Sequence, residues 1–420
     1  MAQISTVSAA DQTTKPDFRP DIQGLRAVAV LLVVANHAGI EQLAGGFVGV
    51  DVFFVISGFL ITGLLIKEAQ LGRGISLPNF YARRARRILP AATLVLLVTV
   101  GASMLLLGTV RASEVGREAL WSAVFSVNWK FAIDGTDYFA SGLPPSPLPH
   151  YWSLAVEEQF YLVWPALFAA VLVLLVGSSA RTRRRRRILT RANQLVLAGV
   201  IGLVGVTSLV YSVLATAASP NAAFFSTFTR AFELAVGALL AVLLPQLALL
   251  PRTARIGLSW LGLAGIAVSA FIFSDATAFP GAIALLPVLS AAMVIIGGTE
   301  GSPGQGNGGQ DRGAVLLLGT LPMRWVGDRS YSLYLWHWPI LVIAAAYLGR
   351  DLSALESAAL VAAALVATVA TYALIEYPIH KGRLRSTRAT SLALWASLHR
   401  IRRCGQPHRC RRGEIRTRPQ

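Results

Sequence analysis

Long apolar runs separated by short polar or charged segments dominate the chain. A helix needs about 20 consecutive, mostly apolar residues to cross the hydrocarbon core of a bilayer, and the runs are close to this length. The pattern predicts an all-α fold, a polytopic transmembrane helical bundle of about ten spans. The expected spans are residues 24–40, 47–66, 89–109, 155–176, 193–214, 224–244, 256–273, 281–297, 330–348 and 355–376.

The composition supports a membrane protein. Hydrophobic residues make up 54% of the 420 positions and charged residues only 14%, and the mean hydropathy is +0.58. Soluble domains carry about 25% charged residues, so this chain lacks the charge to cover a soluble core. Residues 1–20 are polar and lack the apolar centre of a cleavable signal peptide. The first span is therefore expected to act as its own insertion signal.

The positive charge is unevenly distributed. The net charge is +17, and residues 381–420 alone hold twelve Lys or Arg and one Glu. The basicity thus belongs to a tail and to loops, which argues against a nucleic-acid partner. Further arginines cluster at 83–87, 181–187 and 252–255. With ten spans and a cytoplasmic N-terminus, all these clusters lie on one side, as the positive-inside rule requires, so we expect a multi-pass protein of the plasma or inner membrane.

Three regions are expected along the chain. They are a cytoplasmic N-terminal segment (1–20), a membrane domain (21–381) and a basic, disordered tail (382–420). Within the membrane domain, the aromatic and proline-rich stretch 111–150 favours an external or re-entrant lid. The tail begins like an eleventh span, but its apolar pattern stops near Leu398.

One histidine stands inside an apolar run. His37 follows Arg26 by eleven residues, which is about three helical turns, so both side chains share one helix face about 16 Å apart. Snorkelling and an interhelical hydrogen bond are the structural alternatives. Ionisable groups that persist in a membrane usually serve chemistry, and histidine is the usual general base near neutral pH. We expect His37 to be catalytic and Arg26 to bind an anionic substrate.

Arg84 and Arg87 stand three residues apart, as on one helical face, just before the span at 89–109. Ordinary positive-inside charge is the competing interpretation. Paired guanidinium groups also suit bidentate binding of phosphates, so these two arginines are candidate ligands of an anionic cofactor.

Two adjacent carboxylates, Glu157 and Glu158, open the span at 155–176 on its expected external side. Neighbouring helical residues point about 100° apart, so one can face a cavity while the other caps or pairs. Either one is a candidate to orient His37 or to bind sugar hydroxyls, and the sequence does not choose between them.

Asp51 and His337 are candidates for a supporting role. Asp51 begins the second span, where helix capping is an equally good explanation. His337 lies mid-span between two tryptophans, where an interhelical hydrogen bond is the main alternative. The tail residues His399, Cys404, His408 and Cys410 match no standard zinc spacing, and we expect no metal site.

Together these motifs resemble the integral-membrane acyltransferase family 3, particularly its bacterial O-antigen and peptidoglycan O-acetyltransferase branch. The resemblance runs from about Arg19 to Lys381. It rests on the Arg-x10-His pair, the glycine-rich stretch 45–58, the arginines at 83–87, and the stretches 151–161 and 330–339.

The resemblance implies transfer of an acyl group, usually acetyl, from cytoplasmic acyl-CoA to a hydroxyl of an extracytoplasmic glycan or glycolipid. Arg84, Arg87 and Arg26 would then hold the CoA, with no permanently bound cofactor. His37 would deprotonate the acceptor hydroxyl or briefly carry the acyl group.

Many members of this branch continue through an eleventh span into an SGNH-hydrolase-like domain. The apolar pattern that stops near Leu398 leads to the hypothesis of a truncation or a change of reading frame. A glycan or lipid-linked sugar transporter and an inactive remnant of a two-domain enzyme are the alternative functions. A transporter would be expected to show broken helices in two related halves, and the sequence has no such internal repeat.

Overall fold

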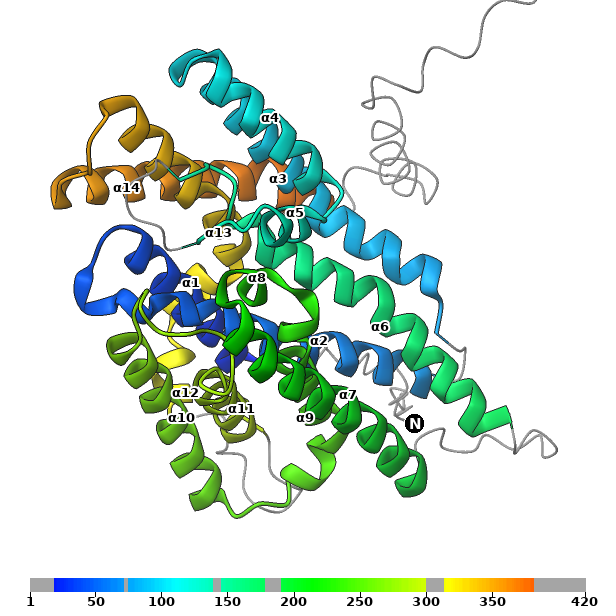
Figure 1. Ribbon diagram of the computed structural model, residues 1–420. Coiled ribbons are helices and arrows are strands. Elements are labelled where there is room, and N and C mark those ends of the chain that lie inside the picture. Colours follow the sequence, from blue (N-terminus) through cyan, green and yellow to red (C-terminus); the bar gives the residue numbers. More distant parts are fainter. Residues whose placement is uncertain (1–18, 72–74, 139–144, 178–189, 300–312, 381–420) are drawn as a thin grey trace, which may run out of the picture.

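The computed structural model describes residues 19–71, 75–138, 145–177, 190–299 and 313–380. Every regular element in these ranges is a helix, so the all-α prediction is confirmed (Figure 1). The tail (382–420) and nearly all of the expected N-terminal segment lie outside the described residues. The helices are α1 (Pro20–His37), η1 (Glu41–Val48), α2 (Gly49–Gln70), α3 (Leu77–Leu106), α4 (Thr109–Ala123), α5 (Val127–Ile133), α6 (Tyr151–Gly177), α7 (Arg191–Ala218), α8 (Pro220–Phe225), α9 (Thr227–Leu247), α10 (Arg252–Ile272), α11 (Leu285–Gly297), α12 (Val315–Leu318), α13 (Leu321–Leu348), α14 (Ala354–Thr371), η2 (Tyr372–Glu376) and α15 (Tyr377–His380).

Eight helical segments of the described chain are long and apolar enough to cross a membrane, and each overlaps one of the ten expected spans. The other two expected spans form shorter or more polar helices. Residues 24–40 fall largely in α1, whose 18 residues include Asp21, Arg26 and His37. Residues 281–297 yield only the 13 residues of α11, because 281–284 form a turn. At 1.5 Å per residue, α11 is about 20 Å long, which is short of the roughly 30 Å of hydrocarbon.

Helices α1 and α2 occupy the centre of the bundle. Helix α1 packs against α13 and α2, and α2 packs against α9 and α6 (Figure 1). Glycines permit this packing, because a Cβ atom at Gly49 would lie 2.2 Å from the carbonyl oxygen of Ala29 on α1. A Cβ atom at Gly58 would lie 1.9 Å from the carbonyl oxygen of Leu234 on α9. Backbone contact on both sides of α2 therefore requires glycine at these positions.

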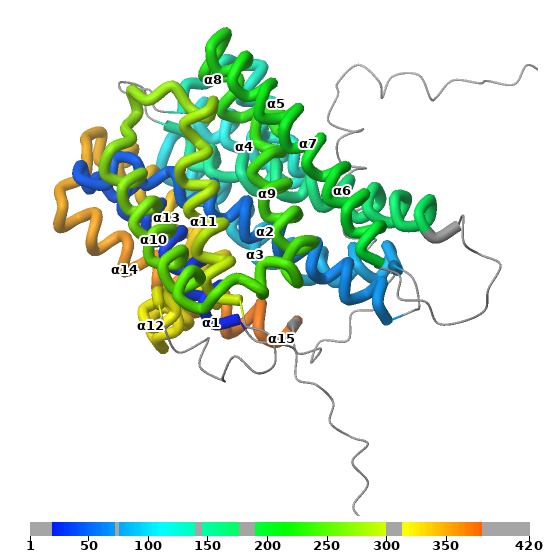
Figure 2. Tube along the Cα trace, turned by 90° about the horizontal axis from the view of Figure 1, so that it is seen from below, coloured from blue at the N-terminus to red at the C-terminus, as the bar shows by residue number. Residues whose placement is uncertain are grey.

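The two ends of the bundle are built differently. Helices α5 and α8 lie at one end, and α12 and α15 lie at the opposite end (Figure 2). The stretch 111–150, which we expected to be a lid, contains most of α4 and all of α5, and α5 packs against α6 and α8. Arg83 to Arg87 lie inside α3, which begins at Leu77, well before the expected span.

Candidate active site

The two candidate histidines contact each other. His37 is the last residue of α1, and His337 lies in the middle of α13. Nδ1 of His37 lies 2.9 Å from Nε2 of His337, and the two rings are stacked almost parallel. Nε2 of His37 lies 3.0 Å from the hydroxyl oxygen of Tyr138. The packing of α1 along α13 therefore makes one site of two residues that are far apart in the sequence.

The hydrogen bonds determine where the protons lie on the two neutral rings. Nδ1 of His337 lies 3.0 Å from the carbonyl oxygen of Leu333, which can only accept, so this nitrogen carries hydrogen. Nε2 of His337 then accepts from the Nδ1–H of His37. This leaves a lone pair on Nε2 of His37, opposite Tyr138. Burial raises the pKa of Tyr138, so its hydroxyl keeps its proton and donates to His37. His37 thus presents a base to a hydroxyl group.

Aromatic side chains hold this arrangement in place. The ring of Trp338 packs against His37 with 4.3 Å between centroids, and its Nε1 donates to the carbonyl oxygen of Ser146. The ring of Tyr138 stacks on Phe224 at 4.7 Å. The rings of His37 and Tyr138, which share a hydrogen bond, are thereby restrained. A positioned general base requires such restraint.

A buried polar layer borders the histidine pair. His150 is fully buried, and its ring lies 5.9 Å from that of His337. The hydroxyl of Tyr334 donates to the carbonyl oxygen of His150 and lies 2.7 Å from Oγ of Ser153. Tyr334 precedes His337 by three residues, which is about one turn of α13. The Tyr334–Ser153 pair therefore separates the histidines from the space that follows.

That space is a cavity of about 110 Å³ enclosed by α1, α2, α3, α6 and α13, which we call the arginine-lined cavity. Tyr334 and Ser153 line it together with the three arginines that the sequence predicts to bind an anionic substrate or cofactor. The charged side chains in its lining are Arg26, Arg84, Arg87 and Glu157. The cavity is therefore net positive, and it reaches to within about one helix turn of His337.

The three arginines differ in how far their charge is already neutralised. Arg84 donates to Glu157 at 3.0 Å and to Glu158 at 3.1 Å. Arg87 has an exposed side chain and no ion pair within the described residues, and Arg26 donates only to Gln23 there. Arg84 is consequently a fixed part of the wall, whereas Arg87 and Arg26 can bind an anion.

The carboxylates Glu157 and Glu158 lie beside Arg84 and do not contact His37. Glu157 also accepts hydrogen bonds from the hydroxyls of Ser57 and Tyr161. Glu157 faces the arginine-lined cavity, and Glu158 faces a separate, mainly apolar cavity between α3, α5 and α6. The sequence predicts that one carboxylate faces a cavity while the other caps or pairs, whereas in the structure each lines its own cavity and both pair with Arg84.

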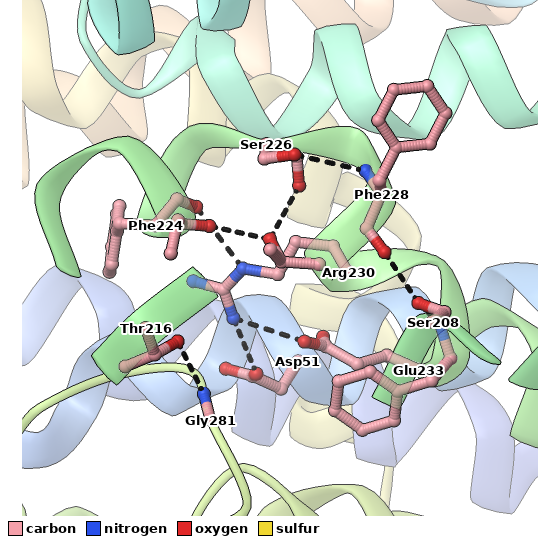
Figure 3. Close-up of polar contacts among 12 residues, drawn as sticks. Asp51, Ser208, Thr216, Phe224, Ser226, Phe228, Arg230, Glu233 and Gly281 are labelled. Carbon is pink, nitrogen blue, oxygen red and sulfur yellow. Dashed lines mark hydrogen bonds and ion pairs between the residues drawn. The ribbon is translucent and has the colours of Figure 1, made fainter. Parts of the chain in front are cut away.

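Asp51 belongs to a buried ionic cluster (Figure 3). Arg230 donates from one nitrogen to Asp51 at 3.0 Å and to Glu233 at 3.1 Å, and all three side chains are at most 1% exposed. Nε of Arg230 donates to the carbonyl oxygen of Phe224 at 3.2 Å. Asp51 therefore joins α2 to α9 and α8, while the base His37 contacts other residues.

Several polar residues around the site are not among those predicted from the sequence. Arg230 and Glu233 stand three residues apart in an apolar run, and this spacing was a readable signal. Ser153 and Tyr334 lie in the stretches 151–161 and 330–339 that carry the family resemblance, but the sequence gives neither of them a role in the site. Tyr138 is one of several aromatic residues in 111–150, and tyrosine is common near membrane interfaces. In the described ranges, no group of three or more His, Cys, Asp or Glu could hold a metal ion, and the candidate tail set lies outside these ranges.

Comparison with known proteins shows the family of the chain. The family defined by an acyltransferase domain matches residues 19–376, which is nearly the entire described structure. The chain belongs to this family. Peptidoglycan O-acetyltransferase OatA of Listeria monocytogenes is 33% identical over 375 residues, which cover 87% of this chain and 56% of that protein. O-acetyltransferase OatA of Staphylococcus aureus is 31% identical over 376 residues, or 87% of this chain and 58% of that protein.

The acyltransferase chain thus spans somewhat more than half the length of these relatives. No solved structure matches it. Family membership and the eight apolar helical segments make it a membrane protein with the acyltransferase domain.

Proposed function

We propose that this chain transfers an acyl group, acetyl in the simplest case, from acyl-CoA to a hydroxyl of an extracytoplasmic glycan. The observation that carries the proposal is Nε2 of His37, an unprotonated nitrogen that faces a hydroxyl group at 3.0 Å. Acyl transfer to an alcohol needs a base at such a position. The names of the relatives support a cell-wall glycan as the acceptor.

The donor binds in the arginine-lined cavity. The phosphates of CoA contact Arg87, whose charge is not neutralised by a carboxylate of the described residues, and Arg26 extends the positive lining inward. Arg84 stays bound to Glu157 and Glu158 and shapes the wall. The thioester then lies near Tyr334 and Ser153, about one turn from the histidine pair.

In the reaction, His37 takes the proton of the acceptor hydroxyl on Nε2. The hydroxyl oxygen attacks the thioester carbonyl carbon, and the carbon–sulfur bond breaks. The CoA thiolate leaves and takes up the proton that Nε2 of His37 removed from the hydroxyl. His337 accepts the Nδ1–H of His37 throughout and keeps Nε2 available as the base. A general base of this kind contributes a factor of about 10²–10⁴ to the rate.

The protein is proposed to lie in the plasma membrane with its N-terminus in the cytoplasm. The arginines of α3 then lie near the cytoplasmic face, where acyl-CoA is made, in agreement with the positive-inside rule. His37 ends α1 toward the opposite face, from which the glycan approaches. Donor and acceptor therefore enter from different sides.

The test compares wild type with His37→Ala and His37→Gln in reconstituted vesicles. The measured quantity is the transfer of labelled acetyl from acetyl-CoA to cell-wall glycan. Glutamine fills the space beside Trp338 and cannot act as a base, so both variants are expected to lose at least about 100-fold in rate. Acetyl-CoA binding and thermal stability, measured on the same preparations, serve as controls for folding. Wild-type rates in both variants would reject catalysis by His37.

The same vesicles test the transporter alternative. A wild-type protein that moves glycan across the membrane without forming acetyl esters would reject the acyltransferase proposal.

A further inference from the structure

A further cavity opens beside Tyr138 and is lined in part by residues of α8. Helices α5 and α8 lie together at one end of the bundle (Figure 2). The volume of this cavity, about 350 Å³, is at the lower end of the range of about 300–1,000 Å³ that small-molecule sites occupy. Carboxylates and an amide form its polar lining, and aromatic rings form the apolar part. We call it the acidic cavity, and its main residues are Asp137, Tyr138, Asn221, Phe224, Asp275 and Phe279.

The aromatic lining is held in place by the buried ionic cluster (Figure 3). The guanidinium of Arg230 lies 4.9 Å from the ring centroids of both Phe224 and Phe279, and its Nε donates to the carbonyl oxygen of Phe224. The backbone N–H of Gly281 donates to Oγ1 of Thr216 at 3.0 Å, which ties the turn after Phe279 to α7. The cavity is therefore preformed.

The charge of the lining selects against anions. Asp137 and Asp275 both have exposed side chains, and no arginine or lysine lines the described part of the cavity. A CoA phosphate or a uronic acid carboxylate would be repelled there. Hydroxyl and amide N–H groups, by contrast, form charge-assisted hydrogen bonds with carboxylates. The aromatic side chains offer apolar surface to the C–H groups of a ring.

The acidic cavity adjoins the proposed base. Tyr138 lines the cavity, and its hydroxyl bonds to Nε2 of His37. The side chain of Tyr138 therefore stands between a ring bound here and Nε2 of His37, the nitrogen that takes the proton. The arginine-lined cavity approaches the same histidine pair from Tyr334. Two cavities with opposite charge thus converge on one site.

We propose that the acidic cavity binds an uncharged sugar ring of the acceptor glycan through Asp137, Asn221 and Asp275. The inference rests on the proposed function for the role of this sugar as acceptor. The existence of the binding site rests on the cavity and its lining alone. The two parts can therefore fail separately.

The first experiment measures binding without catalysis. The full chain is purified in detergent, and its affinity for chitopentaose, a neutral oligomer of N-acetylglucosamine, is measured by calorimetry. The Asp137→Asn/Asp275→Asn double variant is expected to bind on the order of tenfold more weakly, because two charged acceptors are lost. The Ala278→Trp variant places a large side chain at the cavity and is expected to abolish binding. Asp351→Asn, an exposed aspartate outside the cavity, is the matched control and keeps wild-type affinity.

The second experiment tests the charge selection. An anionic oligogalacturonate of similar length is expected to bind wild type at least tenfold more weakly than chitopentaose. In the Asp137→Asn/Asp275→Asn variant, the difference in affinity between chitopentaose and oligogalacturonate is expected to be smaller. Equal affinity of wild type for both oligomers would overturn the argument from charge.

The third experiment separates this site from the proposed function. His37→Ala is expected to retain chitopentaose binding while it loses acetyl transfer. A wild-type protein that binds chitopentaose but transfers no acetyl would reject the function and leave the site standing. No binding to wild type, or wild-type binding by both the double variant and Ala278→Trp, would overturn the site.

Discussion

The arginine-lined cavity and the acidic cavity reach the same histidine pair but are built in opposite ways. The first is enclosed by long helices, and its charged residues belong to α1, α3 and α6. The second is lined by residues that follow α5, by α8 and by the loop between α10 and α11. Residues inside long helices are constrained by their neighbours, whereas loops tolerate substitution. Under the proposed function, the donor occupies the cavity built from long helices and the acceptor occupies the cavity lined largely by loops.

The largest expected effect comes from removing the arginine that supports the acidic cavity. Arg230→Met leaves Asp51 and Glu233 buried without their cation, and breaking such a pair costs about 3–5 kcal/mol. We expect a large fall in the thermal unfolding midpoint in detergent. The triple variant Arg230→Met/Asp51→Asn/Glu233→Gln removes the uncompensated charge and should recover much of the loss. An unchanged midpoint in Arg230→Met would contradict the supporting role.

The next effect concerns His337, the partner of His37 in the histidine pair between the two cavities. His337→Ala removes the acceptor for the Nδ1–H of His37, so we expect kcat to fall on the order of 100-fold, with both KM values little changed. His337→Gln can present an amide oxygen close to the lost nitrogen, so it should retain more activity than alanine. The comparison of kcat in the two variants measures this. Equal kcat values for His337→Ala and wild type would exclude a positioning role for His337.

A smaller effect separates the arginines of the first cavity. Arg87→Ala is expected to raise the KM for acetyl-CoA about tenfold, because a guanidinium–phosphate contact is lost, while chitopentaose affinity stays the same. Acetyl-CoA that lacks the 3′-phosphate should show whether that phosphate is the group bound. Arg83→Ala is the matched control, since Arg83 on the same helix is exposed and pairs with Glu68. A raised KM in Arg83→Ala as well would indicate a general effect of surface charge.

The smallest effect is on salt dependence. Added salt screens exposed charges, so the KM for acetyl-CoA should rise a few-fold between about 0.05 and 0.5 M salt. Chitopentaose is uncharged, so its affinity for the acidic cavity should change much less. Titrations of both ligands on the same protein provide the measurement. Parallel salt dependence for the two ligands would remove the electrostatic distinction between the cavities.

Much of the fold could be predicted from the sequence because the bilayer leaves few alternatives. A long apolar run must be a helix, and eight of the ten expected spans correspond to long apolar helical segments. The two exceptions follow from local chemistry. Helix α1 carries Asp21, Arg26 and His37, and α11 is preceded by a turn that shortens it.

The candidate site was predicted only in part. Arg84 and Arg87 are predicted from the sequence as phosphate ligands and Arg26 as a ligand of an anionic substrate. All three line one cavity, although their role as ligands stays a proposal. His37 and His337 were chosen separately, and the pattern of either span gave no sign that they touch. The partners of Glu157 and Glu158 were open, because a pairing with Arg84 depends on how α3 packs beside α6.

The sequence by itself determined the helices, the membrane class and the identity of the ionisable residues that a membrane does not readily accept. These are local properties of residue type and spacing. Only the tertiary structure decided that His37 bonds to His337 and Tyr138, that Arg230 joins Asp51 to Glu233, and that two oppositely charged cavities approach one histidine pair. Contacts of this kind depend on which helix faces meet, and glycines at the α1–α2 and α2–α9 contacts allow those faces to approach.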